Sequence, residues 1–195
     1  MIPSVTKQAF AEYDEDRKRL ARELHGSALQ DLAALQMNLS LISGEHLSSR
    51  AVKLVEDCAA LARSCAGEIR RAGSQLYPAM LDEAGLGAAV RVFAAERGIT
   101  LLPDMPEDFG ALPYQIAIGT FRLVEELVGG CEKPHGATLN VSLIPDWLVI
   151  SVAGAGEIRA SVRERVAALG GKYAFFQTGS WRTVIVRLPL TDEES

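Results

Sequence analysis

The spacing of apolar residues in the first half of the chain constrains its fold most strongly. Between residues 5 and 42 they recur at steps of three or four, at Leu20, Leu24, Ala28, Leu32, Leu35, Leu39 and Ile42. A turn at residues 42–49 precedes a second stripe, at Val52, Val55, Ala59, Ala62, Ala66, Ile69, Gly73 and Leu76. Such spacing is typical of helices that pack against other helices. Because one helical hairpin cannot cover both stripes, we expect a homodimer that completes a four-helix bundle.

The second half of the chain has a different pattern, in which helices alternate with runs typical of β-strands. Helices are expected at residues 85–98, 111–133 and 160–169, and strands at residues 99–102, 137–144, 147–154, 172–178 and 181–190. Strands joined by short turns indicate a mostly antiparallel sheet with the helices on one face. The expected fold class is therefore α+β, with a helical hairpin over residues 1–78 and an α/β sandwich over residues 79–195.

Composition excludes several classes of function. The net charge of −5 argues against nucleic acid as the main partner, because phosphate binding needs a basic face. The most basic stretch, Arg17–Arg22, stands between Asp16 and Glu23 and is expected to be a solvated helix face. Cys58, Cys65 and Cys131 form neither a CxxC pair nor a metal-binding spacing. No metal site is therefore expected.

The sequence also lacks signals for a membrane or for export. No apolar run reaches the roughly 18 residues that a membrane helix requires. The N-terminal residues lack the basic-then-apolar order of a signal peptide. We expect a cytoplasmic protein with no membrane segment in this chain.

Several segments resemble bacterial sensor histidine kinases, in the order in which that family carries them. "RLARELHGSALQ" (residues 19–30) is similar to the phosphoacceptor helix of the subfamily that includes nitrate sensors, and "EIRRAGSQLYPAMLDEAGLGAAV" (68–90) to the end of its dimerisation domain. "FRLVEELVGGCEK" and "SVAGAG" stand where its ATP-binding domain carries the N and G boxes, and "VRERVAALGG" with "TVIVRLPL" is similar to its closing segment. The resemblance implies a homodimeric hairpin joined to a Bergerat-type ATPase fold.

The resemblance makes His25 the phosphoacceptor. Gln30 stands where the family uses a glutamine to position water for dephosphorylation, and Arg22, one helical turn before His25, could pair with a phosphoryl group. In the family an acidic residue follows the histidine and accepts its Nδ1 proton, which leaves Nε2 oriented as the nucleophile. Gly26 stands there instead and offers no acceptor. Without the family context, His25, Arg22 and Gln30 would be interpreted as ordinary helix-surface residues.

In the second half, the resemblance implies a vestigial nucleotide site. Glu126 stands at the N-box glutamate, a candidate base or organiser of metal-bound water. Lys133 keeps the N-box lysine, although the usual following histidine is replaced by Pro134. Gly154 and Gly156 keep both glycines of the G box, or they simply form a turn that leaves a strand.

Two polar groups of that nucleotide site are missing. Gly130 replaces the N-box asparagine and has no side chain to offer to Mg²⁺. Val152 replaces the G-box aspartate that accepts the adenine amino group, and an unpaired buried polar edge costs about 1–3 kcal/mol. Only residues 157–162 separate Gly156 from Arg163, which leaves no room for a glycine-rich lid over phosphates. We therefore expect no cofactor and no useful binding of ATP or Mg²⁺.

These features predict a two-component protein in which His25 exchanges a phosphoryl group with the aspartate of a response-regulator receiver domain. The expected partners are a second copy and the receiver domain, with a partner histidine kinase as a further possibility. Two alternatives stay open. One is an active sensor histidine kinase that phosphorylates His25 with ATP and Mg²⁺. The other is a non-catalytic pseudokinase that acts through its contacts, so the sequence leaves enzymatic activity undecided.

Overall fold

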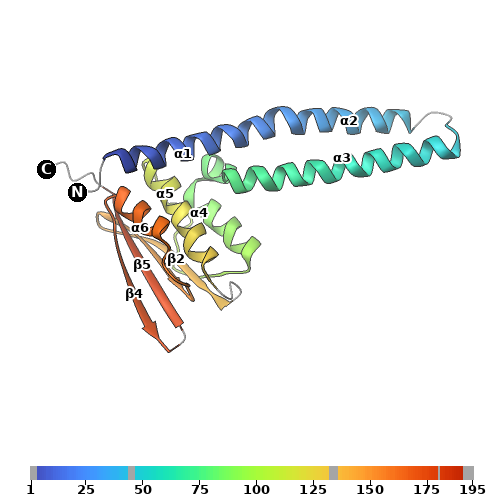
Figure 1. Ribbon diagram of the computed structural model, residues 1–195. Coiled ribbons are helices and arrows are strands. Elements are labelled where there is room, and N and C mark those ends of the chain that lie inside the picture. The colour runs from blue at the N-terminus through green and yellow to red at the C-terminus, as the bar shows by residue number, and fades with distance from the viewer. Residues whose placement is uncertain (1–3, 44–46, 132–135, 180, 191–195) are drawn as a thin grey trace. The chain divides into compact units, whose positions relative to one another are not determined.

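The computed structural model describes residues 4–43, 47–131, 136–179 and 181–190. The chain forms two compact units: Tyr13–Pro78, and a second unit made of Met1–Glu12 with Ala79–Ser195. The first unit is helical and the second is a five-stranded sheet with shorter helices, which confirms the expected α+β class (Figure 1). In these residues no helix is both long enough and apolar enough to cross a bilayer.

The helical unit is a hairpin of two long segments. Within this unit, the first segment runs from Tyr13 of α1 (Ser4–Glu23) through a π-helical turn η1 (Leu24–Ala28) and α2 (Leu29–Ile42), and α3 (Ser49–Leu76) returns beside α2 (Figure 1). Ala62 and Ala66 of α3 are buried, and such small side chains allow two helix backbones to approach closely. The expected hairpin is therefore present.

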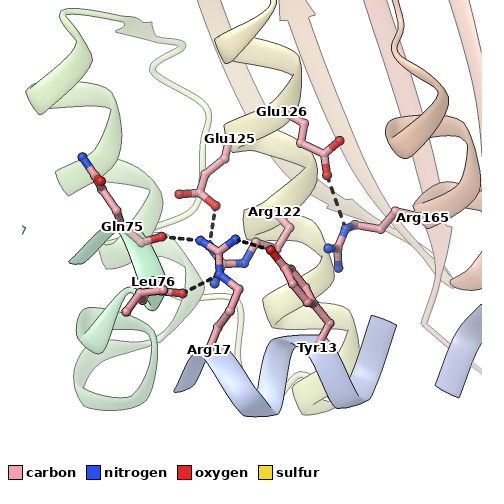
Figure 2. Close-up of polar contacts among 8 residues, drawn as sticks. All are labelled: Tyr13, Arg17, Gln75, Leu76, Arg122, Glu125, Glu126 and Arg165. Atoms are coloured by element: carbon pink, nitrogen blue, oxygen red, sulfur yellow. Dashed lines mark hydrogen bonds and ion pairs between the residues drawn. The ribbon is translucent and has the colours of Figure 1, made fainter. Parts of the chain in front are cut away.

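Two basic residues of α1 hold the end of α3. Arg17 donates from Nε to the carbonyl oxygen of Leu76 at 3.0 Å and from a terminal nitrogen to that of Gln75 (Figure 2). The Lys18 ammonium lies 4.9 Å from the centre of the Tyr77 ring. Carbonyl groups at a helix C-terminus carry partial negative charge and attract cations. The expectation of a purely solvated basic face is therefore wrong for Arg17 and Lys18.

The sheet of the second unit has the strand order β1-β2-β3-β5-β4, and only β1 and β2 are parallel. Helices α4, α5 and α6 lie on one face of this sheet (Figure 1). The elements are α4 (Ala79–Arg97), β1 (Thr100–Leu101), α5 (Tyr114–Gly129), β2 (Thr138–Ile144), β3 (Trp147–Ala153), α6 (Ala160–Ala168), β4 (Lys172–Thr178) and β5 (Trp181–Pro189). Alternate residues of the inner strands are fully buried and form the core, at Leu139, Val141, Leu148, Ile150, Val152, Val184, Val186 and Leu188.

The helix boundaries differ from the sequence-based expectation at two places. α4 begins at Ala79, with Gly85 inside it at φ 80°, a backbone conformation that glycine adopts readily. A helix was expected only from residue 85. α5 ends at Gly129 rather than continuing to residue 133. This earlier end places Gly130 just after the helix, where it contacts the segment that follows β3.

Candidate functional site

The expected phosphoacceptor, His25, lies in the π-helical turn η1 with its side chain exposed. The apolar stripe explains the turn, because Leu20, Leu24, Ala28 and Leu32 are each four residues apart. On a regular helix each step of four advances about 40° beyond a full turn, so three steps rotate the stripe by about 120°. A π-helix closes its backbone hydrogen bonds over five residues and is wider, so it takes up part of this drift.

The surroundings of the His25 imidazole are open. In the part of the chain that the structure describes, no hydrogen bond or ion pair engages it. A Cβ at Gly26 would meet no atom within 4 Å beyond the local helix backbone, so that position has space for a side chain. The Ser27 hydroxyl donates to the Glu23 carbonyl oxygen at 3.0 Å. The imidazole is thus exposed, and none of the described residues hydrogen-bonds to it as a base.

The structure places Arg22 in the last turn of α1 and Gln30 in the first turn of α2, both with exposed side chains. His25 therefore lies between the two other candidate residues on one continuous helical segment. No hydrogen bond among the described residues joins Gln30 to His25.

At the second candidate site, the Glu126 carboxylate is bound by two residues of the neighbouring helix α6. Its Oε1 lies 3.5 Å from Nε of Arg165 on α6, and its Oε2 accepts a hydrogen bond from the Ser161 hydroxyl at 2.5 Å (Figure 2 shows the ion pair). Arg165 is only 5% exposed, and its guanidinium lies 4.4 Å from the centre of the Phe10 ring. Both carboxylate oxygens of Glu126 are therefore bound to α6, which begins soon after the G-box segment.

Gly130, which replaces the N-box asparagine, and Gly156, which is the second glycine of the G box, are packed against each other. A Cβ on Gly156 would overlap the carbonyl oxygen of Gly130, so the two backbones are in direct contact. The carbonyl of Gly156 also accepts a hydrogen bond from the Arg182 guanidinium at 3.1 Å, and the amides of Gly154 and Ala155 donate to the Arg182 carbonyl. The G-box segment is therefore held between the end of α5 and the start of β5.

Val152 lies within the apolar core. It is fully buried in β3, opposite Leu139 on β2 and Val184 on β5. A side chain at this position faces other hydrocarbon groups, so nothing here can accept a hydrogen bond from an adenine amino group. Among the described nucleotide-site positions, neither Val152 nor Gly130 offers a polar side chain, and both carboxylate oxygens of Glu126 are bound to α6.

The remaining predicted residue of the nucleotide site, Lys133, lies outside the described residues. Sequence reasoning missed Ser161, Arg165 and Ser27. A signal existed for Arg165, because it shares the helical spacing of the buried Val162 and Val166 and so had to be partly buried. For Ser27 the signal was a serine inside a helix, where the hydroxyl tends to bond to the carbonyl four residues earlier.

Comparison with known proteins bears on the first of these sites. Residues 16–81 match the HisKA_3 family model, which describes histidine kinases. The sensor histidine kinase NarS of Mycobacterium tuberculosis is 29% identical over 205 residues, covering 89% of this chain and 45% of NarS. The sensor histidine kinase MctS of Rhizobium johnstonii is 29% identical over 172 residues, covering 80% of this chain and 36% of MctS. The chain thus spans less than half the length of these curated relatives.

Solved structures give a weaker likeness. The histidine kinase domain of the blue-light activated histidine kinase from Erythrobacter litoralis EL346 aligns with 81% of this chain and 96% of that domain. The TM-score is 0.46 and the sequence identity is 16%.

Proposed function

Because the chain carries a HisKA_3 histidine kinase domain and is homologous to sensor histidine kinases, we propose that it exchanges a phosphoryl group between His25 and a response-regulator aspartate without effective use of ATP. The observation that carries this proposal is a contrast between the two halves. Among the described residues, His25 is exposed and makes no hydrogen bond or ion pair, whereas Glu126 is bound to α6, Gly130 contacts Gly156, and Val152 is buried in the core.

The proposed reaction needs only an accessible imidazole from this chain. The donor is the acyl phosphate of a receiver aspartate. A lone pair on an imidazole nitrogen of His25 attacks phosphorus and forms the P–N bond. The P–O bond to the aspartate breaks, and its electron pair returns to the carboxylate. The receiver domain supplies the acidic pocket and the Mg²⁺, so the open space beside Gly26 does not prevent transfer.

Three observations argue against ATP as the phosphoryl source. Glu126 has both oxygens engaged by α6, so it is not available to organise a metal-bound water without breaking the Arg165 ion pair. The contact between Gly130 and Gly156 occupies space beside the G-box backbone. Val152 offers the adenine edge no acceptor. We infer that the second unit has a structural or docking role.

Homodimerisation is part of the same proposal. Beside the buried stripe, α3 carries a second apolar stripe at steps of four, three and four, formed by Leu54, Cys58, Leu61 and Cys65. Leu54 and Leu61 are 57% and 66% exposed, and Met37 and Leu41 of α2 are exposed to a similar degree. Helices with two apolar stripes gain stability by burying the second one in a bundle. A second copy that buries this stripe would complete the four helices.

Replacing Leu61 with lysine is expected to weaken the dimer, because each of the two copies loses one buried leucine. Burial of a leucine is worth about 1.5–3 kcal/mol, so the dissociation constant should rise roughly 100-fold or more. Sedimentation equilibrium measures this shift. The control is Glu56→Lys, which places the same residue on an exposed position of α3 outside both stripes.

Cysteine reactivity provides a second measure of the dimer. Cys58 and Cys65 are exposed in the single chain, so a thiol reagent should modify them faster in Leu61→Lys than in the wild-type dimer. Cys131 should stay unreactive in both proteins, because it is buried and burial raises the pKa of its thiol. A wild-type protein that is monomeric at high micromolar concentration, or a variant of unchanged mass, would refute this arrangement.

The proposed function is tested with a receiver domain that carries a radiolabelled phosphoryl group. Each receiver encoded near this chain's gene, or a panel of receivers, is phosphorylated chemically, freed of donor and mixed with the protein. We expect label to move to this chain and to be acid-labile and base-stable, as phosphohistidine is. Failure of every receiver in the panel to pass label would contradict the proposal.

A further inference from the structure

The π-helical turn around His25 contains a hydrogen bond that links its first carbonyl to a side chain inside it. The Ser27 hydroxyl donates to the Glu23 carbonyl oxygen at 3.0 Å. In a π-helix the carbonyl of residue i accepts a backbone hydrogen bond from residue i+5 rather than i+4. Through the Ser27 hydroxyl, the Glu23 carbonyl is hydrogen-bonded to the residue four positions later, as it would be through the backbone of a regular helix.

This turn changes the relation between His25 and Gln30. The two are five residues apart, which on a regular helix at about 100° per residue would separate their side chains by about 140°. A turn closed over five residues brings residue i+5 back toward the face of residue i. Leu24 and Ala28 stay half-buried while His25 is exposed, so the turn preserves packing on one face and presents the imidazole on the other.

The local sequence supports a wide turn at this place and not elsewhere in the segment. Gly26 has no side chain to restrict the backbone, and consecutive four-residue steps of the apolar stripe occur only over residues 20–32. After residue 32 the steps alternate between three and four, and the chain continues as the regular helix α2. Ser74 makes the same type of bond, to the Arg70 carbonyl at 3.0 Å, inside the regular helix α3. Ser27 thus differs from Ser74 in its setting, because its hydrogen bond lies where the apolar spacing and Gly26 already favour a wide turn.

We propose that Ser27 is a positioning residue for phosphoryl transfer at His25. Its hydroxyl holds η1 in the π-helical form, which sets the direction of the imidazole and brings Gln30 toward the same face. This inference rests on the proposed function for its kinetic consequence. The effect of Ser27 on the conformation of the turn does not depend on whether phosphoryl transfer occurs.

The test compares Ser27→Ala, Ser27→Thr and Ser74→Ala with wild type. Ser27→Ala removes the hydroxyl, Ser27→Thr keeps it, and Ser74→Ala removes an equivalent hydrogen bond from a regular helix in the same unit. Transfer from a phosphorylated receiver is measured as kcat and KM. Backbone chemical shifts of residues 23–30 and the imidazole signals of His25 are recorded by NMR on the unphosphorylated proteins.

We expect Ser27→Ala to lower kcat about fivefold to tenfold with little change in KM, since misdirection of a reacting group reduces the rate without weakening docking. The chemical shifts of residues 23–30 and the His25 imidazole signals should move in Ser27→Ala only. Ser27→Thr should restore the rate, and Ser74→Ala should match wild type. An unchanged kcat in Ser27→Ala, or an equal loss in Ser74→Ala, would overturn the proposal. If wild type transfers no label, the proposed function fails, and the NMR comparison still decides whether Ser27 holds the turn.

Discussion

Replacing His25 with alanine is expected to lower phosphoryl transfer from a phosphorylated receiver domain by at least about a thousandfold, because the variant has lost the attacking nitrogen. The side chain is exposed and makes no hydrogen bond or ion pair with the described residues. Its removal should therefore change the free energy of unfolding by no more than about 0.5 kcal/mol. The measurement is the initial rate of label transfer, with thermal unfolding as the check on folding.

The matched control is His46→Ala, which removes an imidazole from another position of the same half of the sequence. It should transfer label at the wild-type rate. Equal transfer by His25→Ala and wild type would show that His25 is not the acceptor. If His25→Ala also regulated a partner kinase as well as wild type does, the non-catalytic pseudokinase would be the better account.

Replacing Val152 with aspartate is expected to destabilise the protein by about 3–5 kcal/mol, although it restores the residue type that the kinase family has there. Val152 is fully buried between Leu139 and Val184, so the new carboxyl would have hydrocarbon neighbours and no cation to pair with. The free energy of unfolding in urea measures the loss. Val152→Ala is the control for lost volume and should cost less than the aspartate.

The pH dependence separates charge from volume in this variant. Burial should raise the pKa of the introduced carboxyl above its value in the unfolded chain, so the folded state binds more protons. Stability of Val152→Asp relative to Val152→Ala should then fall as pH rises from about 3, where the carboxyl is mostly protonated in both the folded and the unfolded state, toward 7. A Val152→Asp variant as stable as wild type at pH 7 would show that the side chain at this position is not buried away from water.

Most of the secondary structure could be predicted because local pattern determines it. Steps of three and four predicted the hairpin, and alternation with a turn near Asp146 predicted β2 and β3. The wide turn at His25 was not predicted, although the signal was in the sequence. Three consecutive steps of four do not fit a regular helix, although each step alone is ordinary for a helical stripe.

The candidate nucleotide site shows what local pattern could not provide. The absence of polar side chains at Gly130 and Val152 could be read directly from the sequence. The engagement of Glu126 by Ser161 and Arg165 could not, because these residues are 35 or more positions away and meet Glu126 only when α5 and α6 pack together. The close approach of Gly130 and Gly156 likewise depends on tertiary packing.

We propose that this chain keeps the phosphoacceptor histidine but does not draw its phosphoryl group from ATP. Calorimetric titration of Mg²⁺-ATP into the protein tests it most directly. We expect no saturable heat up to millimolar nucleotide, because Glu126 is engaged by α6, Val152 offers no adenine acceptor and Gly130 offers Mg²⁺ no ligand. Saturable binding with a micromolar dissociation constant would contradict the account and support the active sensor histidine kinase.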